Sequence, residues 1–166
     1  MIGPEEVEFF YNANQDRIRK VLESLKRERS HKVDYLFSKH YLPVKSSTDC
    51  SICARCCKLL EAGLDQEDIG LLSNSCLMEP KTFIGSYVGF ESSTNTSYIK
   101  NKPCPFLSGN LCAHYLSRPK ACADYPGLER PDIKYRLRSV QNNAAVCPIV
   151  ANTLIRIAQE IGLPLD

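Results

Sequence analysis

The sequence lacks the features that mark a membrane protein, a secreted protein or a polyanion binder. None of its apolar runs approaches the ~18–20 residues of a transmembrane helix. The N-terminal stretch 1–8 is acidic and has no apolar segment behind it, so it does not predict a secretory signal. Lys and Arg number 21 against 19 Asp and Glu, a near balance without a polyanion-binding footprint. We expect a cytoplasmic protein with no membrane or nucleic-acid partner, and a protein partner stays open.

Cysteine is the residue that this sequence has in excess. It contains nine cysteines among 166 residues, in a chain that is 43% apolar and 24% charged, a composition typical of a folded domain. In the cytosol thiols are kept reduced, and clustered cysteines there indicate metal binding or catalysis more often than disulfides. An odd count also fits poorly with a closed disulfide framework. The thiols are therefore the candidates for chemistry.

Helices are predicted at both ends of the chain. Residues 1–45 contain no cysteine, and Ile18, Val21 and Leu22 follow the spacing of an amphipathic helix. Pro43 is expected to end this region. The last helix is expected to open at Pro148 and to stop before a glycine and a proline.

Shorter elements are predicted between these helices. An acidic first turn indicates a helix over residues 65–73, whereas two glycines make residues 83–90 irregular. Residues 98–116 carry a hairpin signal with its turn at 108–110. Alternating apolar and basic residues over 133–138 indicate a half-exposed strand.

Together these patterns predict an α+β fold. We expect a small cysteine-rich metal-binding domain with a β-hairpin, flanked by N-terminal and C-terminal helices. The N-terminal helical region spans residues 1–45. The cysteine-cluster domain spans residues 46–166 and ends in an amphipathic helix, and both regions form one folded unit.

The densest pattern is a group of four cysteines within eight residues: Cys50, Cys53, Cys56 and Cys57. Two intervening residues let a tight turn aim a pair of sulfurs at one metal. Adjacent side chains diverge by about 100° on a helix, so a helical segment would put Cys50, Cys53 and Cys57 on one face and Cys56 elsewhere. We infer that the adjacent pair is divided between two centres.

Later cysteines supply further ligands. A three-residue loop at 108–110 would pair Phe106 with Cys112, which places Cys104 and Cys112 on the same face of the hairpin. The predicted metal ligands form one or two centres and are Cys50, Cys53, Cys56, Cys57, Cys104, Cys112, Cys122 and Cys147. Cys76 is left over, and we interpret it as an inert, partly buried thiol. His114 is interpreted as a metal ligand, a donor to a ligand, or a solvated hairpin residue.

Thiolate ligands narrow the choice of metal. They are soft donors, so calcium and magnesium are excluded as the main occupant. Zinc accepts four thiolates in a closed structural site. Iron–sulfur clusters also take four, and the two Cys-Pro steps loosely match the ferredoxin pattern, so we favour an iron–sulfur cluster over Zn²⁺ and leave both open. The basic residues placed to offset the thiolate charge are Arg55, Lys58, Arg118 and Lys120.

The cysteine motifs resemble the YkgJ-type cysteine-cluster family, a zinc- or iron-chelating domain. The resemblance spans residues 50–147 and rests on Cys50-x-x-Cys53-x-x-Cys56-Cys57, Cys104-Pro105-Phe106-Leu107 and Cys112-x-x-Tyr115-x-x-Arg118-Pro119-x-x-Cys122-x-x-Tyr125-Pro126. Ala123 departs from the arginine that is usual in that family, and His114 stands where an aliphatic residue is common. A similar cluster occurs in flagellin lysine N-methylases, which implies an enzymatic alternative.

The sequence thus predicts a metal-binding protein and keeps two alternatives. One is a cluster-dependent redox or group-transfer enzyme of methyltransferase-like type, and the other is a structural-zinc protein-interaction module. No G-x-G-x-x-G cofactor fingerprint or nucleophile–base arrangement stands out, so no catalytic residue is assigned. Tyr115, Asp124 and Tyr125 lie near the cysteines, where we expect core and turn roles.

Overall fold

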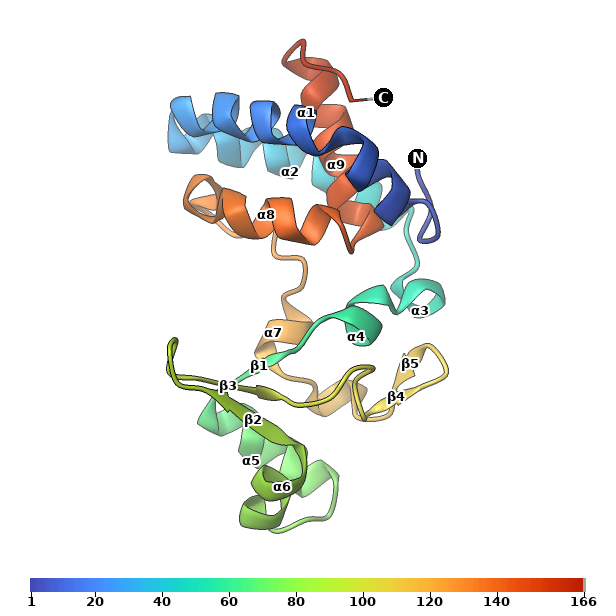
Figure 1. The fold of residues 1–166 in the computed structure, drawn as a ribbon, viewed down its shortest axis with the longest axis vertical. Helices are drawn as coiled ribbons and strands as arrows, with labels where there is room; N and C mark the ends of the chain where they lie inside the picture. Colours follow the sequence, from blue (N-terminus) through green and yellow to red (C-terminus); the bar gives the residue numbers. More distant parts are fainter. Residues whose placement is uncertain (166) are drawn as a thin grey trace. The chain divides into compact units, whose positions relative to one another are not determined.

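The computed structural model describes residues 1–165, and the chain divides into two compact units (Figure 1). The first unit comprises Met1–Asp49 and Pro126–Asp166, and the second comprises Cys50–Tyr125. The fold is α+β, with helices toward both ends of the chain and small antiparallel sheets between them, as the sequence predicts. None of the helices within residues 1–165 combines the length and hydropathy needed to cross a bilayer.

The first unit is helical. Its two longest helices, α1 (Val7–Arg27) and α2 (Ser30–Ser46), follow the predicted amphipathic pattern and bury apolar faces. They pack against α8 (Leu137–Ala144) and α9 (Pro148–Glu160), α2 chiefly on α9 and α1 chiefly on α8. The predicted end at Pro43 is wrong: α2 runs one turn further, because buried Val44 packs that last turn into the core.

The strand predicted over 133–138 is also wrong. This segment forms the 3-10 helix η2 (Ile133–Arg136) and the start of α8. Ile133 and Leu137 are buried whereas Tyr135 is 78% exposed, so the buried positions are four residues apart rather than two. The Asp34 carboxylate accepts the backbone N–H groups of Asp132 and Ile133, both at 3.0 Å, and thereby holds the helical turn.

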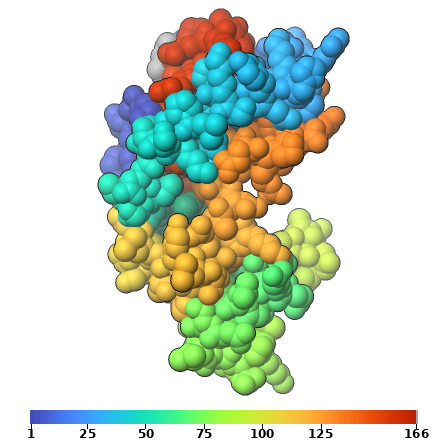
Figure 2. All heavy atoms as spheres, turned by 180° about the vertical axis from the view of Figure 1, so that it is seen from behind, coloured from blue at the N-terminus to red at the C-terminus, as the bar shows by residue number. Residues whose placement is uncertain are grey.

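The second unit carries short helices and two small antiparallel sheets. Its sheets have the strand orders β1-β3-β2 and β4-β5. The turn between β2 and β3 is exposed and projects from the surface, yellow-green in Figure 2. In chain order the elements are α3 (Cys50–Cys53), α4 (Arg55–Leu59), β1 (Gly63–Leu64), α5 (Gln66–Ser75), α6 (Pro80–Tyr87), β2 (Val88–Glu91), β3 (Thr96–Ile99), β4 (Leu107–Ser108), β5 (Leu111–Cys112), the 3-10 helix η1 (Tyr115–Ser117) and α7 (Lys120–Ala123).

The core of the second unit is a small cluster in which the rings of Phe83 and Phe106 stack with centroids 6.0 Å apart. The predicted helix at 65–73 is confirmed as α5. The irregular segment predicted over 83–90 is wrong, because Pro80 opens α6 and the chain then enters β2. Gly89 belongs to that strand: a Cβ there would lie 2.5 Å from the Tyr98 ring, so the glycine makes room for its cross-strand partner.

Candidate metal centre

The first cysteine segment is two short helical turns separated by one left-handed residue. Cys50 and Cys53 belong to α3, and Cys56 and Cys57 belong to α4. Between them Ala54 is buried and has φ 48° and ψ 17°, a conformation that costs an ordinary residue about 1–2 kcal/mol. Because this residue interrupts the helix, the continuous helical face predicted for Cys50, Cys53 and Cys57 is wrong.

The sulfurs of the adjacent pair lie close together. Cys56 Sγ and Cys57 Sγ are 3.9 Å apart, whereas helical geometry predicts that these side chains diverge. Two thiolates on one tetrahedral zinc, with Zn–S bonds of about 2.3 Å, lie about 3.8 Å from each other. The observed separation is therefore compatible with two sulfurs that share one metal.

The hairpin that carries Cys112 has a different register from the predicted one. Leu107 pairs with Cys112 and Ser108 with Leu111, so the loop contains only Gly109 and Asn110. The predicted pairing of Phe106 with Cys112 is wrong, because Gly109, at φ 61°, allows a two-residue turn. Cys104 lies outside the strand, where its carbonyl accepts the Leu107 N–H at 3.0 Å. This hydrogen bond closes a turn over residues 104–107, directly before the hairpin.

Three hydrogen bonds join the hairpin to the first cysteine segment. The backbone N–H of Cys104 donates to the Cys57 carbonyl at 2.8 Å. The Asn110 amide donates to the Ile52 carbonyl and accepts from Lys58 Nζ, both at 2.8 Å. The chain around Cys104 and Cys112 therefore lies against the turns that carry the first four cysteines.

Cys122 is positioned by the acidic start of α5. Asp65 and Asp68 form a reciprocal capping box at this helix end. The second oxygen of buried Asp68 accepts the backbone N–H of Lys120 at 3.0 Å. The Lys120 ammonium in turn contacts Asp65 at 3.1 Å and Glu67 at 2.6 Å. Because α7 begins at Lys120, these contacts fix the short helix on which Cys122 lies.

Neighbouring thiols change the pKa values of three cysteines in the second unit: Cys57, Cys104 and Cys122. The hydrogen bond between Cys56 Sγ and Cys57 Sγ lowers the pKa of Cys57 to about 6, and the charge of Lys58 lowers it further. Burial of the sulfur raises the pKa of Cys122 to about 12, although the residue as a whole is exposed, and negative charge on Cys57, Cys104 and Cys112 raises it further. Burial and then the charges of Cys57 and Cys112 likewise raise the pKa of Cys104.

The chemistry of this donor set fits a bound cation. Like charges oppose the joint ionisation of neighbouring thiols, and a soft metal ion removes that penalty by binding them as thiolates. A zinc ion or an iron–sulfur cluster accepts such ligands. The thiols whose charges oppose one another in this way are Cys57, Cys104, Cys112 and Cys122.

The remaining predicted ligands are placed differently. Cys50 is exposed and Cys53 half-buried on α3, while Cys147 is buried in the first unit at the start of α9. Across residues 1–165, no three His, Cys, Asp or Glu side chains are grouped so that they could hold a metal ion. The backbone of the second unit brings the thiol-bearing segments together, but the sulfurs do not form a coordination shell, and the set of eight ligands stays a prediction.

His114 makes contacts that the sequence did not reveal. Its Nδ1 lies 2.7 Å from Ser75 Oγ, its Nε2 lies 3.5 Å from Cys76 Sγ, and its ring meets the Phe106 ring edge-on with centroids 5.1 Å apart. Burial raises the pKa of Cys76. The imidazole therefore ties the end of α5 to the chain just after Cys112. No sequence signal links these residues, because 38 positions separate Cys76 from His114.

The basic residues near the cysteines have distinct neighbours. Lys58 acts on the Cys57 thiol, as described above, and the Nη2 atom of Arg55 is buried beside the first cysteine segment. The Arg118 guanidinium instead lies 3.8 Å from the centre of the Tyr115 ring, and Lys120 pairs with carboxylates. Of the four basic residues expected to offset thiolate charge, Lys58 is thus one that lowers the pKa of a cysteine.

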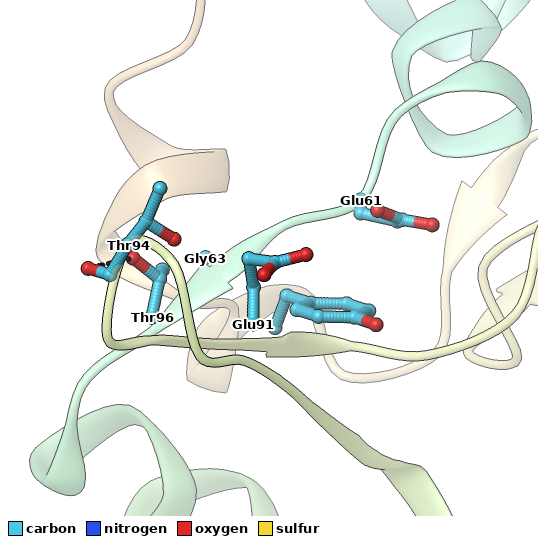
Figure 3. A pocket seen from close by; sticks show the side chains of 6 residues that line it. Glu61, Gly63, Glu91, Thr94 and Thr96 are labelled. Atoms are coloured by element: carbon cyan, nitrogen blue, oxygen red, sulfur yellow. Dashed lines mark hydrogen bonds between the residues drawn. The ribbon is translucent and has the colours of Figure 1, made fainter.

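A shallow pocket lies on the three-stranded sheet rather than among the thiols (Figure 3). Its volume is about 320 Å³ and no cysteine lines it. Glu61 pairs with Lys102 at 3.2 Å, and Glu91 accepts hydrogen bonds from the backbone and hydroxyl of Ser93, which lower its pKa. The pocket's carboxylates are therefore engaged by neighbouring residues. It is lined by Glu61, Gly63, Glu91, Thr94, Thr96 and Tyr98.

Comparison with protein-family models agrees with the motif resemblance. Residues 49–148, more than half of the 166-residue chain, match the model CxxCxxCC, described as a putative zinc- or iron-chelating domain. This range contains all eight of the predicted ligands. Neither the search of curated proteins nor that of solved structures found a match. The chain, with its thiols gathered from three separate segments, belongs to the CxxCxxCC family of putative zinc- or iron-chelating domains.

Proposed function

We propose that this chain is a cytoplasmic metal-binding protein whose clustered thiolates hold an iron–sulfur cluster or zinc. One observation carries the proposal: thiols from three separate segments lie near one another. The backbone N–H of Cys104, in the turn before β4, donates to the Cys57 carbonyl of α4 at 2.8 Å, and the charges of both thiols raise the pKa of Cys122 on α7. With Cys112 they supply the four thiolates that either metal centre takes. In this proposal Cys50, Cys53 and Cys56 are ligands of a second centre or extend the first.

Support for metal binding also comes from the small core of the second unit. Its buried apolar cluster contains only six residues for the segment Cys50–Tyr125. Small domains with limited cores commonly derive part of their folding free energy from a structural metal. Metal–thiolate bonds across α4, the hairpin and α7 would join segments that the core alone holds weakly.

We favour an iron–sulfur cluster over zinc because of the dense thiols and the two Cys-Pro steps. When bound, such a cluster supplies one-electron redox chemistry, whereas zinc in a closed thiolate site supplies stability. The protein's own residues orient the thiols in either case. The pKa of Cys57 is lowered to about 6, which favours its thiolate, and Lys58 adds a positive charge beside it.

The test is anaerobic purification followed by metal analysis, acid-labile sulfide analysis and a visible absorption spectrum. We expect a brown protein that contains iron and sulfide. A colourless protein with one or two zinc ions per chain would replace the cluster by zinc and retain the metal-binding function. A protein that holds neither metal, and that takes up neither after reduction and anaerobic reconstitution, would overturn the proposal.

A further inference from the structure

Asn110 uses both ends of its side-chain amide in contacts far along the chain. Nδ2 donates to the Ile52 carbonyl at 2.8 Å, 58 residues away. Oδ1 accepts from Lys58 Nζ at 2.8 Å, 52 residues away. The hairpin turn itself does not require these two hydrogen bonds, because Gly109 already supplies the positive φ that a two-residue turn needs.

The two partners of Asn110 lie on opposite sides of the left-handed Ala54. Ile52 is in α3, between Cys50 and Cys53, whereas Lys58 is in α4, directly after Cys57. A continuous helix would fix the direction of one turn relative to the next through its repeating hydrogen bonds, but Ala54 interrupts that repeat. A side chain that bonds to both turns restores the constraint.

We propose that Asn110 is a positioning residue of the metal centre. Its amide holds α3 and α4 at a fixed orientation against the hairpin, so that the thiols of α3 stay beside Cys57 and Cys112, in the same centre or in a second one next to it. This inference rests on the metal-binding function proposed above. The carbonyl of Cys57 provides a second, backbone anchor for the same hairpin through Cys104, so α4 stays attached when Asn110 is changed, whereas α3 does not.

The variant Asn110→Asp separates this role from simple turn stability. Aspartate has the same size and suits turns, and it keeps an oxygen for Lys58. It replaces the N–H donor to Ile52 with an acceptor, so only the contact to α3 is lost. Asn110→Ala removes both contacts. Ser108→Ala, an exposed position in the same hairpin, is the matched control.

The full chain is reduced, freed of metal and titrated anaerobically with Co²⁺, whose thiolate charge-transfer absorption reports binding. We expect Asn110→Asp to bind Co²⁺ about 10-fold more weakly, at the lower end of the range for losing a group that orients metal ligands, because Asn110 contacts the neighbours of the cysteines rather than the cysteines themselves. Zinc-loaded protein is then alkylated with iodoacetamide and analysed by peptide mass spectrometry. Cys50 and Cys53 should lose protection in the variant, while Cys57 and Cys104 keep it, and Ser108→Ala should match the wild type.

Two results distinguish failure of this inference from failure of the function. A wild-type chain that binds neither Co²⁺ nor Zn²⁺, and that takes up no iron–sulfur cluster on anaerobic reconstitution, would overturn metal binding itself. Wild-type affinity in both Asn110 variants, or loss of protection spread evenly over all thiols, would overturn the positioning role alone. Far-UV circular dichroism of the metal-free chain checks folding, and Asn110→Ala takes the place of Asn110→Asp if the latter unfolds.

Discussion

Cys57 and Cys76 are thiols of one chain with opposite surroundings. Cys57 has its pKa lowered to about 6 by the hydrogen bond with Cys56 and by Lys58. Cys76 has its pKa raised by burial, and its sulfur faces His114 rather than another thiol. Since the ligands of a four-thiolate centre must lie near one another, these neighbouring groups, a thiol for Cys57 and an imidazole for Cys76, separate a ligand from a packing residue.

Replacing each thiol by serine tests this separation. We expect Cys57→Ser to lower the metal content per chain to about half or less, since one thiolate of a four-thiolate centre is then missing. Cys76→Ser should retain the wild-type content. Elemental analysis of anaerobically purified protein measures both. Equal metal loss in the two variants would contradict the assignment of Cys76 as a packing residue.

At the scale of elements, the buried Asp68 carboxylate connects two helices. One oxygen completes the capping box of α5 and the other accepts the first backbone N–H of α7. Each contact satisfies a backbone donor that has no partner within its own helix. Short α7, with only four residues, depends on such an external contact to stay in place.

Asp68→Ala should therefore destabilise the second unit. Loss of a helix cap and of a buried acceptor predicts a cost of about 2–3 kcal/mol. Denaturant unfolding followed by circular dichroism measures it. Glu67→Ala is the matched control: it removes an exposed ion pair with Lys120, so less than about 1 kcal/mol is expected. If the two variants cost the same, Asp68 does not act through the buried contacts.

A second contact between elements gives a pH dependence in the first unit. Glu160 of α9 accepts from Lys39 at 2.7 Å and contacts His40 at 2.6 Å, both in α2. These contacts lower the pKa of Glu160 below its ordinary value of 4.5, so the ionised form is favoured in the folded state. These contacts therefore stabilise the folded state above about pH 4.5, the ordinary pKa of a glutamate. The stabilisation is lost as the pH falls through the lowered pKa that Glu160 has in the folded state.

Thermal unfolding between pH 6 and pH 3 tests this dependence. The wild-type unfolding temperature should fall more steeply below about pH 4.5 than that of Glu160→Gln, which has no carboxyl to protonate. Glu5→Gln, at an exposed position in the same unit, should follow the wild-type curve. Parallel curves for wild type and Glu160→Gln would show that the contact contributes no acid sensitivity.

For the whole molecule, the two units differ in what stabilises them. The first unit buries long apolar helix faces, including Leu25, Phe37, Leu154 and Ile157. The second has a small apolar cluster and carries seven of the eight predicted ligands. Metal removal should therefore affect the units unequally.

Hydrogen–deuterium exchange after treatment with a strong chelator measures this difference. We expect amides of Cys50–Tyr125 to exchange faster without metal, while α1, α2, α8 and α9 keep their protection. The reduced but untreated protein is the control. Unchanged exchange throughout Cys50–Tyr125, in protein shown to have lost its metal, would mean that the metal is not part of the folding free energy.

Local patterns predict much of this fold because their causes lie within a few residues. The cap of α5 depends on Asp65 and Asp68, three positions apart, and the amphipathic helices repeat their apolar residues every turn. The strand predicted at 133–138 fails because Ile133 and Leu137 fit both a period of two and one of about four. The contact with Asp34, far away in sequence, holds the helical turn that is observed.

The candidate site is predictable in membership but not in assembly. Spacing and thiol chemistry identify the cysteines, and the motif order identifies the family. The hydrogen bonds of Asn110 to Ile52 and of Lys120 to Asp68, by contrast, join segments more than 50 residues apart. Such contacts leave no periodic trace in the sequence, so the geometry that joins the thiols had to be observed.

The discontinuous composition of the first unit has a consequence for biosynthesis. α1 and α2 leave the ribosome long before α8 and α9, on which they pack, because the whole segment Cys50–Tyr125 is translated in between. When the segment Cys50–Tyr125 has been translated in full, the first unit still lacks α8 and α9. During translation the thiol-bearing unit therefore has all of its residues before the helical unit does. The helical unit, although it contains the first helix, can pack completely only after α9 has emerged.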